Sequence, residues 1–185
     1  MDDIVLPLPQ TYSLNFDDIR RGSRKVEEVV TDLYAMLRPS LLSYVYYLVG
    51  STRDAEDLIQ VAFLQLFDQL NQGAEIRNLR GWLYRVVHNL AIEHARRTDK
   101  RESLIRGWFS DREKATASAP SAEDELIRRE LIEKSLAALN ERERHALMLR
   151  AEGLSYQEIA ETLDISAKSV SVYLARGLKK FEPKR

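Results

Sequence analysis

Apolar residues recur at helical spacing in two long stretches of the first half of the chain. In residues 25–49 the apolar stripe consists of Val26, Val29, Val30, Leu33, Leu37, Leu41, Val45 and Leu48. In residues 51–70 it consists of Ala55, Leu58, Ile59, Ala62, Phe63, Leu66 and Leu70. Because positions three and four apart share one side of a helix, two amphipathic helices are predicted. Pro39 interrupts the first stripe and is predicted to break or kink that helix into two segments meeting near Arg38.

Pairs of residues with the spacing of helix caps mark where helices begin. Ser51 with Asp54, Asn140 with Glu143, and Ser155 with Glu158 each place a capping residue three positions before an acidic one. Further helices are predicted from near Asn78 through RGWLYRVVHNLAIEHARR, from Glu123 to about Leu139, and from Asn140 to Gly153 as the residue after the helix end. The predicted fold class is therefore all-α.

Two short helices joined by a tight turn are predicted in residues 153–181. The first begins at Ser155 and ends near Leu163, and Ser166 caps the second, which reaches about Phe181. A buried stripe of Val170, Leu174, Leu178 and Phe181 is expected on the second helix. This pattern is typical of a helix-turn-helix.

The other side of that last helix carries small polar and basic residues, which can approach a DNA major groove. These residues are Lys168, Ser169, Ser171, Val172, Arg176 and Lys179. Residues 166–185 hold six Lys/Arg and one Glu, a balance that suits phosphate neutralisation. The alternative is a helical hairpin with a solvated basic face, and the agreement of caps, turn and charge favours DNA binding.

Two stretches without helical periodicity divide the chain. Residues 1–24 contain Pro7, Pro9 and Gly22 and are interpreted as a loosely ordered extension. Residues 102–122 end in a run of small residues with Pro120 and are interpreted as a linker, and Trp108 and Phe109 within it are candidates for docking on a partner. Two small helical domains are therefore predicted, over residues 25–101 and 123–185.

The side of the second helix opposite its apolar stripe mixes acids with aliphatic residues. Projection at helical spacing places Asp57, Gln60, Val61, Leu64 and Asp68 together. Acidic residues alone would indicate a solvated face, whereas the aliphatic residues among them favour a surface for a partner.

Aromatic and basic residues interleave on the helix that begins near Asn78. Leu83, Val86, Val87 and Leu90 are expected to face the core. Tyr84, Arg85, His88, Asn89 and Arg96 are expected on the remaining surface, with Trp82 beside them. Aromatic rings stack on unpaired bases and guanidinium groups follow phosphates, so this mixture suits single-stranded DNA. For Trp82 a place in the core is the competing interpretation.

Charge is segregated along the chain although the net charge is only −1. Residues 76–106 carry 3 acids against 8 bases and residues 166–185 carry 1 against 6, whereas residues 1–68 and 121–164 each carry 11 against 6. This pattern predicts two nucleic-acid contacts and an acidic surface for another partner. The chain has no cysteine and three scattered histidines, so no metal site, cofactor or catalytic constellation is predicted. No secretory signal or membrane-spanning stretch is seen, and a cytoplasmic location is expected.

Two blocks of sequence resemble a known family. DAEDLIQVAFLQLF followed by WLYRVVHNLA, and later LNERERHALMLRAEGLSYQEIAETLDIS, resemble regions 2 and 4 of bacterial extracytoplasmic-function (ECF) sigma factors. The resemblance covers about residues 25–101 and 123–181. It implies a promoter-specificity subunit of RNA polymerase that has no catalytic site.

The resemblance also implies roles for individual residues. Asp54, Asp57, Gln60, Val61 and Leu64 would bind the β′ clamp of core polymerase, and region 4 would contact the β flap. The loop 71–78 and the following helix would capture and melt the −10 element through Asn71, Arg77, Asn78, Trp82, Tyr84, Arg85, Asn89, Arg96 and Arg97. The basic face of the last helix would read the −35 element as duplex DNA. An anti-sigma factor is a further candidate partner.

One alternative remains open at the level of sequence. An autonomous helix-turn-helix regulator, whose first domain binds a ligand or a protein, would share the last two helices. The stretch Trp82–Arg97 discriminates between the two, because an autonomous duplex binder would not need it.

Overall fold

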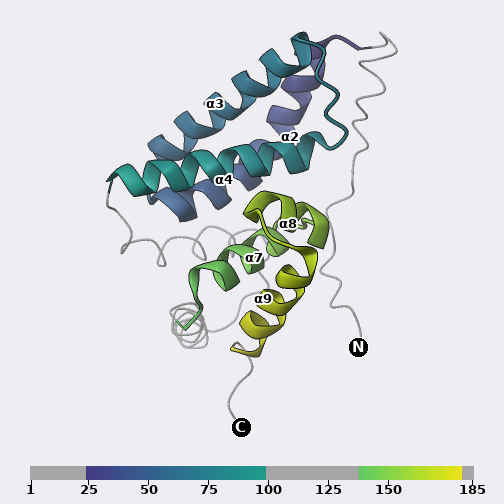
Figure 1. The fold of residues 1–185 in the computed structure, drawn as a ribbon. Helices are drawn as coiled ribbons and strands as arrows, with labels where there is room; N and C mark the ends of the chain where they lie inside the picture. The colour runs from purple at the N-terminus through teal and green to yellow at the C-terminus, as the bar shows by residue number, and fades with distance from the viewer. Residues whose placement is uncertain (1–23, 99–137, 181–185) are drawn as a thin grey trace, which may run out of the picture.

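The computed structural model describes residues 24–98 and 138–180, which contain six α-helices and no strand (Figure 1). The helices are α2 (Val26–Val49), α3 (Thr52–Asn71), α4 (Leu79–Thr98), α7 (Glu141–Ala151), α8 (Tyr156–Leu163) and α9 (Ala167–Lys179). The all-α fold class is confirmed. The predicted extension, the linker with Trp108 and Phe109, the helix from Glu123 and the end of the last stripe at Phe181 lie outside the described residues.

Helix α2 runs through Pro39 as one element, so the predicted break is wrong, whereas the alternative of a kink at this position stays a prediction. Proline removes one backbone donor, and so one bond of the helical ladder is lost at that position. Residues on both sides of the proline, Leu37 and Leu41 among them, are buried, so both halves of the helix pack against the core. The helix ends at Gly50, which has a left-handed φ of 71° and donates its N–H to the Tyr46 carbonyl at 2.7 Å.

The first three helices, α2, α3 and α4, pack against one another. The Ser51 hydroxyl caps α3 by accepting from the Asp54 N–H at 3.3 Å, as its spacing predicted. Of the seven predicted apolar positions of α3, six are buried and Leu58 is half-buried. These residues pack against α2 and α4, and an ion pair between Arg38 and Glu56 joins α2 to α3 at the surface. The long stripes seen in the sequence therefore form the core of this first group.

The second group consists of α7, α8 and α9. Both predicted capping boxes are present, at Asn140 with Glu143 and at Ser155 with Glu158. Asp164 adopts a left-handed φ of 52°, which turns the chain sharply between α8 and α9. Ser166 then caps α9 by accepting from the Ser169 N–H at 3.1 Å. The helix-turn-helix therefore forms where the sequence placed it.

The predicted buried stripe on α9 is wrong at one residue, Leu178. Val170 and Leu174 are buried, but Leu178 is 46% exposed and Gly177 takes the next buried position. A Cβ added at Gly177 would lie 2.5 Å from Leu147 Cδ1, so the glycine lets α9 approach α7 closely. The close approach turns Leu178 outward, and its predicted burial is wrong.

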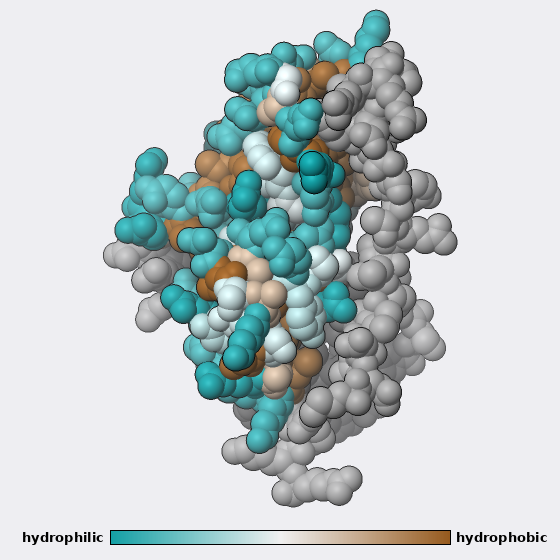
Figure 2. Space-filling view, turned by 45° about the vertical axis from the view of Figure 1, so that its right-hand side comes forward, coloured by the Kyte–Doolittle hydropathy of each residue, from teal (hydrophilic) through white to brown (hydrophobic). Residues whose placement is uncertain are grey.

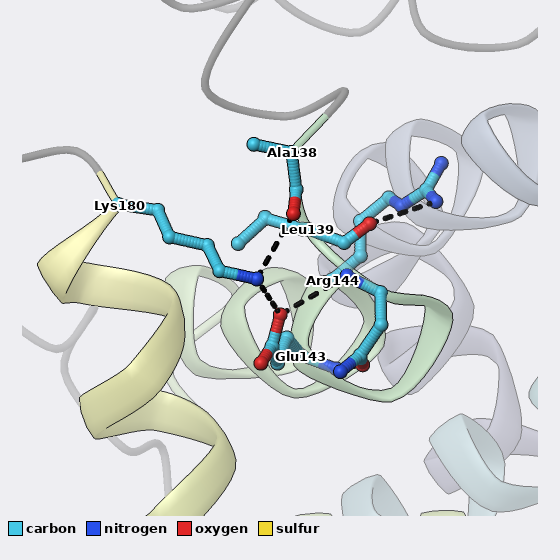
Figure 3. Close-up of polar contacts among 6 residues, drawn as sticks. Ala138, Leu139, Glu143, Arg144 and Lys180 are labelled. Carbon is cyan, nitrogen blue, oxygen red and sulfur yellow. Dashed lines mark hydrogen bonds and ion pairs between the residues drawn. The ribbon is translucent and has the colours of Figure 1, made fainter.

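The end of α9 is fastened to the start of α7 (Figure 3). Lys180 Nζ donates to Glu143 Oε2 at 2.6 Å and to the Ala138 carbonyl at 2.9 Å. The same Glu143 oxygen accepts from the Asn140 N–H at 3.0 Å. Glu143 is buried, and the hydrogen bond from Lys180 lowers the pKa of its carboxyl group. A buried carboxylate thus joins the first and last residues of this helical group.

The two helical groups lie against each other, with α8 beside α4 (Figure 1). The buried apolar residues of α2, α3 and α4 and those of α7, α8 and α9 belong to one contiguous cluster. Helix α4 is therefore covered on one side by α2 and α3 and on another by α8. This position matters for the site residues that α4 carries.

Candidate nucleic-acid and polymerase interfaces

Helix α9 presents a basic face. Lys168, Val172, Arg176 and Lys179 recur three or four residues apart on one side of the helix, and all four are exposed. Ser171 is exposed beside them, whereas Ser169 is half-buried, and its N–H and hydroxyl both contact Ser166. The structure therefore brings the predicted duplex-reading residues together on one surface.

Helix α3 presents the predicted mixture of acids and aliphatic residues. Leu64 is 64% exposed and Val61 is 40% exposed, while Asp57 and Gln60 are exposed around them. Exposed aliphatic residues with no cover in the described structure are favourable sites for a partner. Asp54 differs from the others, because it is half-buried and its Oδ2 lies 3.3 Å from His94 Nε2 of α4. Asp54 therefore joins α3 to α4 as well as lying at the edge of this surface.

The surface of the molecule is mixed in polarity (Figure 2). On the visible face, hydrophobic residues show as separate patches among hydrophilic ones, at the height of α2–α4 and lower at α7–α9. In the described part of the chain, no helix is both long and apolar enough to cross a membrane. The same residues contain no cluster of three or more His, Asp or Glu able to hold a metal ion.

One side of α4 is polar and accessible. Asn78, Arg85, Asn89 and Arg96 are exposed and recur at helical spacing, with Trp82 half-buried among them. Arg96 and Arg97 form ion pairs with Glu93, the closer being Arg97 Nε to Glu93 Oε1 at 3.0 Å. Asn71 and Arg77, in the loop before α4, are also exposed. Most of the predicted single-strand contacts thus share one face.

Two residues predicted on that surface lie on the other side of α4. Tyr84 has no exposed area and His88 is only 8% exposed, so their surface placement is wrong. The Tyr84 ring packs 5.8 Å from the ring of Tyr44 in α2, and the Arg80 guanidinium lies 5.4 Å from its centre. His88 Nδ1 lies 2.7 Å from the Tyr44 hydroxyl and its ring contacts His145 of α7. In this arrangement Tyr84 cannot stack on a base.

Burial sets the ionisation of this buried cluster. The pKa of His88 is lowered to about 3, mainly by burial and then by His145. The pKa of His145 is lowered to about 4, mainly by burial and then by Arg144. Burial also raises the pKa of the Tyr44 hydroxyl. All three side chains are therefore neutral near neutral pH.

The start of α4 is bound to the second helical group. Asn78 Oδ1 caps α4 by accepting from the Gly81 N–H at 2.8 Å, while Asn78 Nδ2 donates to Glu158 Oε1 of α8 at 2.9 Å. Arg80 donates through Nη1 to the Gly153 carbonyl at 3.3 Å and through Nη2 to the Glu152 carbonyl. Burial raises the pKa of Glu158, but the hydrogen bonds from Asn78 and Ser155 lower it overall. Ionised Glu158 is thus a strong acceptor for Asn78.

Comparisons with known proteins match both helical groups. Residues 33–101 match the family model of sigma-70 region 2, and residues 129–181 match that of sigma-70 region 4. The chain belongs to the ECF sigma factors. Among relatives, the ECF RNA polymerase sigma factor SigW of Bacillus subtilis is 25% identical over 86% of this chain and 88% of its own length. The ferric citrate uptake sigma factor FecI of Escherichia coli is 27% identical over 80% of this chain and 85% of its own.

Other relatives differ in length or are known as structures. SigE of Mycolicibacterium smegmatis is 31% identical over 71% of this chain, which spans about half of that relative's length (52%). CnrH in complex with the cytosolic domain of CnrY has a TM-score of 0.59 at 21% identity, covering 88% of this chain and 90% of that one. RpoE in complex with the anti-sigma factor NepR from Bartonella quintana has a TM-score of 0.56 at 20% identity, covering 82% and 93%. These two structures share the fold of this sigma factor.

Sequence reasoning missed the residues through which the two regions of this sigma factor contact each other. Arg80 binds backbone carbonyls 72 and 73 positions away, and backbone carbonyls have no signature in a sequence. His145 was counted only as one of three scattered histidines, and His88 was predicted on the exposed surface of its helix. A signal for His88 did exist, because Tyr84, His88, Ala91 and Ala95 recur at helical spacing and all are buried.

Proposed function

We propose that this sigma factor binds core RNA polymerase through the exposed strip on α3. Leu64 and Val61 would supply apolar burial against the β′ clamp, and Asp57 and Gln60 would supply charge and hydrogen bonds around them. The support is an uncovered aliphatic pair within an acidic surface. Asp54 would orient this strip through its contact with His94. In the same proposal region 4 contacts the β flap.

The basic face of α9 would read the −35 element as duplex DNA. Its exposed lysines and Arg176 can neutralise phosphates or reach base edges, and the small Ser171 leaves room for a groove to approach. Ser166 caps the N-terminal end of α9, and Ala167 and Lys168 in its first turn are exposed. A helix presented in this way is the usual reading element of a helix-turn-helix.

The exposed face of α4 and the loop before it would hold the −10 element as its strands separate. Arg85, Asn89, Arg96 and Arg97 would follow phosphates, and Trp82 is the aromatic residue of this face that is accessible enough to meet a base. Asn71, Arg77 and Asn78 would line the position of an extruded base. Tyr84 is not retained as a base contact, since it has no exposed area.

The observation that carries the whole proposal is that α3, α4 and α9 present three separate surfaces of different chemistry. One is acidic and aliphatic, one is basic with an aromatic residue, and one is basic with small polar residues. An autonomous duplex reader needs only the last. We also propose an anti-sigma factor as a partner, since the similar RpoE structure contains one.

The test is transcription with purified components. The sigma factor is added to core RNA polymerase on a library of promoter sequences, and initiation at a defined set of sequences is expected. Tight duplex binding by the protein alone, without initiation from any template, would favour the autonomous regulator instead.

A further inference from the structure

An apolar side chain lies in the middle of the basic face of α9. Val172 is 39% exposed, and the exposed cations Lys168 and Arg176 lie four positions before and after it. Residues four apart on a helix share one side and are separated by about 6 Å along the axis, so the two cations flank Val172. Ala175, which is also exposed, lies beside Val172. This surface is therefore small and apolar in the middle and cationic at both ends.

Neither packing nor helix formation accounts for this valine. The buried residues of α9 are Val170, Leu174 and Gly177, on the side that packs against α7 and α8, and Val172 is not among them. An apolar side chain left this exposed loses part of the stabilisation that burial would give. A β-branched residue is also a poorer helix former than alanine or lysine. A solvated basic helix would be more stable with either of those residues at this position.

Val172 is held in a defined position. Its side chain has one strongly preferred rotamer in a helix. Helix α9 is fixed at its start by the Ser166 cap and at its end by Lys180, which donates to Glu143 of α7 (Figure 3). Gly177 brings the helix close to α7 between these two points. A ligand that covers Val172 therefore causes little further loss of side-chain entropy.

The chemistry of the major groove limits what an apolar side chain can recognise there. Adenine, guanine and cytosine present only hydrogen-bond donors and acceptors at this edge, whereas thymine also presents its C5-methyl group. Valine has no side-chain donor or acceptor, so a polar base edge pressed against it would lose water without a replacement partner. Contact with thymine instead buries one methyl group against others. The flanking cations suit the phosphates on either side of the groove.

We propose that Val172 is a specificity-determining residue that selects thymine, through its C5-methyl group, at one base pair of the −35 element. Lys168 and Arg176 would hold the duplex on either side of that base pair. This inference rests on the duplex-reading role given to α9 under Proposed function and adds to it the identity of one base. Uracil differs from thymine only by this methyl group, so the proposal concerns a single group of the DNA.

The test uses holoenzyme assembled from the full chain and core RNA polymerase. A −35 element is taken from the promoters on which this holoenzyme initiates, and each of its thymines, in either strand, is replaced singly by deoxyuridine. The replacement keeps base pairing and every donor and acceptor of the base. At one position the affinity of the holoenzyme for the promoter should fall about fourfold, as expected for the lost burial of one methyl group. Replacement of the other thymines should leave the affinity unchanged.

Two variants show whether Val172 is the group that contacts the methyl. In Val172→Ala the sensitivity to deoxyuridine should be lost, because the branched side chain is gone. Leu178→Ala is the matched control, since Leu178 is an exposed apolar residue of the same helix that lies outside the basic face. This control should keep the sensitivity of the parent. Circular dichroism checks that both variants are folded.

The outcomes separate this inference from the function on which it rests. Initiation at a defined set of promoters, with no position sensitive to deoxyuridine, would overturn the role of Val172 and leave the duplex-reading role of α9 standing. An undiminished effect in folded Val172→Ala would do the same. If the holoenzyme initiates on no promoter, the duplex-reading role fails and the inference fails with it.

Discussion

The imidazole rings of His88 and His145 lie edge to face between α4 and α7, with centroids 5.2 Å apart and planes at 81°. Both histidines are buried, and their pKa values are lowered to about 3 and about 4. Around them lie the Tyr44 hydroxyl of α2 and the charges of Glu141 and Arg144 in α7. A protonated imidazole at this position would meet a second ring and an arginine in a poorly solvated place.

Acid should therefore weaken the contact between the two regions. In the unfolded chain these histidines have the ordinary pKa of 6.5 and become protonated below that pH. In the folded chain their lowered pKa values keep them neutral down to about pH 4. The free energy of unfolding thus falls as pH falls below about 6.5, by up to about 1.4 kcal/mol per pH unit for each imidazole. Thermal melts between about pH 7.5 and pH 5 should show a falling Tm.

A double variant, His88→Gln with His145→Gln, is the control for this effect. Its Tm should depend less on pH over the same window, even if it is lower throughout. The carboxylates of Glu143 and Glu158 have lowered pKa values, so they lose their contribution only below about pH 4.5. Equal slopes for parent and double variant above about pH 5 would contradict the prediction.

Substitutions in the exposed strip of α3 should weaken binding to core polymerase without unfolding the protein. Asp57→Arg combined with Leu64→Ala should weaken binding to core polymerase at least about tenfold, because an interface loses both charge complementarity and apolar burial. Both residues are exposed, so the Tm should change little. Binding is measured with labelled sigma factor and core enzyme. An exposed α3 position outside the strip, Gln65→Ala, is the control, and equal affinity of the two variants would contradict the prediction.

On α9, Arg176→Ala and Lys179→Ala should have different effects. If Arg176 reaches a base edge, its loss costs about 1–3 kcal/mol and relaxes preference at one position of the −35 element. If Lys179 contacts a phosphate, its loss weakens binding to all sequences and lowers the salt slope by about one. Binding to a set of single-base duplex variants at several salt concentrations separates the two. Uniform effects from both substitutions would remove Arg176 from the base-reading residues.

The proposed melting role is assigned to the exposed face of α4, and Tyr84 is not part of it because its side chain is buried. Arg85→Ala with Asn89→Ala should impair initiation on duplex promoters and leave initiation on a template already mismatched across the −10 region nearly normal. Premelting removes the cost of unpairing, so weakened strand contacts matter less. Tyr84→Ala should instead destabilise the fold by about 3–5 kcal/mol, as expected for a buried aromatic residue.

Transcription on the two templates, together with a thermal melt, distinguishes these outcomes. A folded Arg85→Ala, Asn89→Ala protein that is equally defective on both templates would show that this face does not serve strand opening. A Tyr84→Ala protein with unchanged Tm would contradict the burial argument.

The ion pair between Lys180 and Glu143 predicts a change in stability. Lys180→Met should lower the free energy of unfolding by about 1–2 kcal/mol, since a buried carboxylate loses a charged donor. Lys179→Met, at the neighbouring exposed position, is the matched control and should change stability little. Urea unfolding followed by circular dichroism gives both values. Equal changes in the two variants would show that the ion pair contributes nothing measurable.

Local signals predicted the helices well, and long-range contacts account for the errors. The capping boxes at Asn140 and Ser155 involve residues three positions apart, so the sequence contained the whole interaction. Pro39 was overridden by burial on both sides of it. Leu178 was displaced by a glycine whose importance depends on Leu147 of another helix.

The candidate site was also predicted only in part: correctly on α3 and α9, and with errors on α4. The faces of α3 and α9 are exposed to solvent, so helical projection found their residues. Helix α4 is covered by two separate layers, and projection onto a single core assigned Tyr84 and His88 to the surface. The bond between Asn78 and Glu158 spans 80 positions and has no local signal.

The bond between Lys180 and Glu143 has a mechanical consequence for DNA reading. Helix α9 is held at its beginning by the tight turn at Asp164 and at its end by a carboxylate of α7. A helix anchored at both ends cannot tilt alone, so any torque applied to α7 also reorients the reading face of α9. A protein bound to α7 would thereby change the orientation of the proposed reading face of α9 without contacting DNA or the residues of that face.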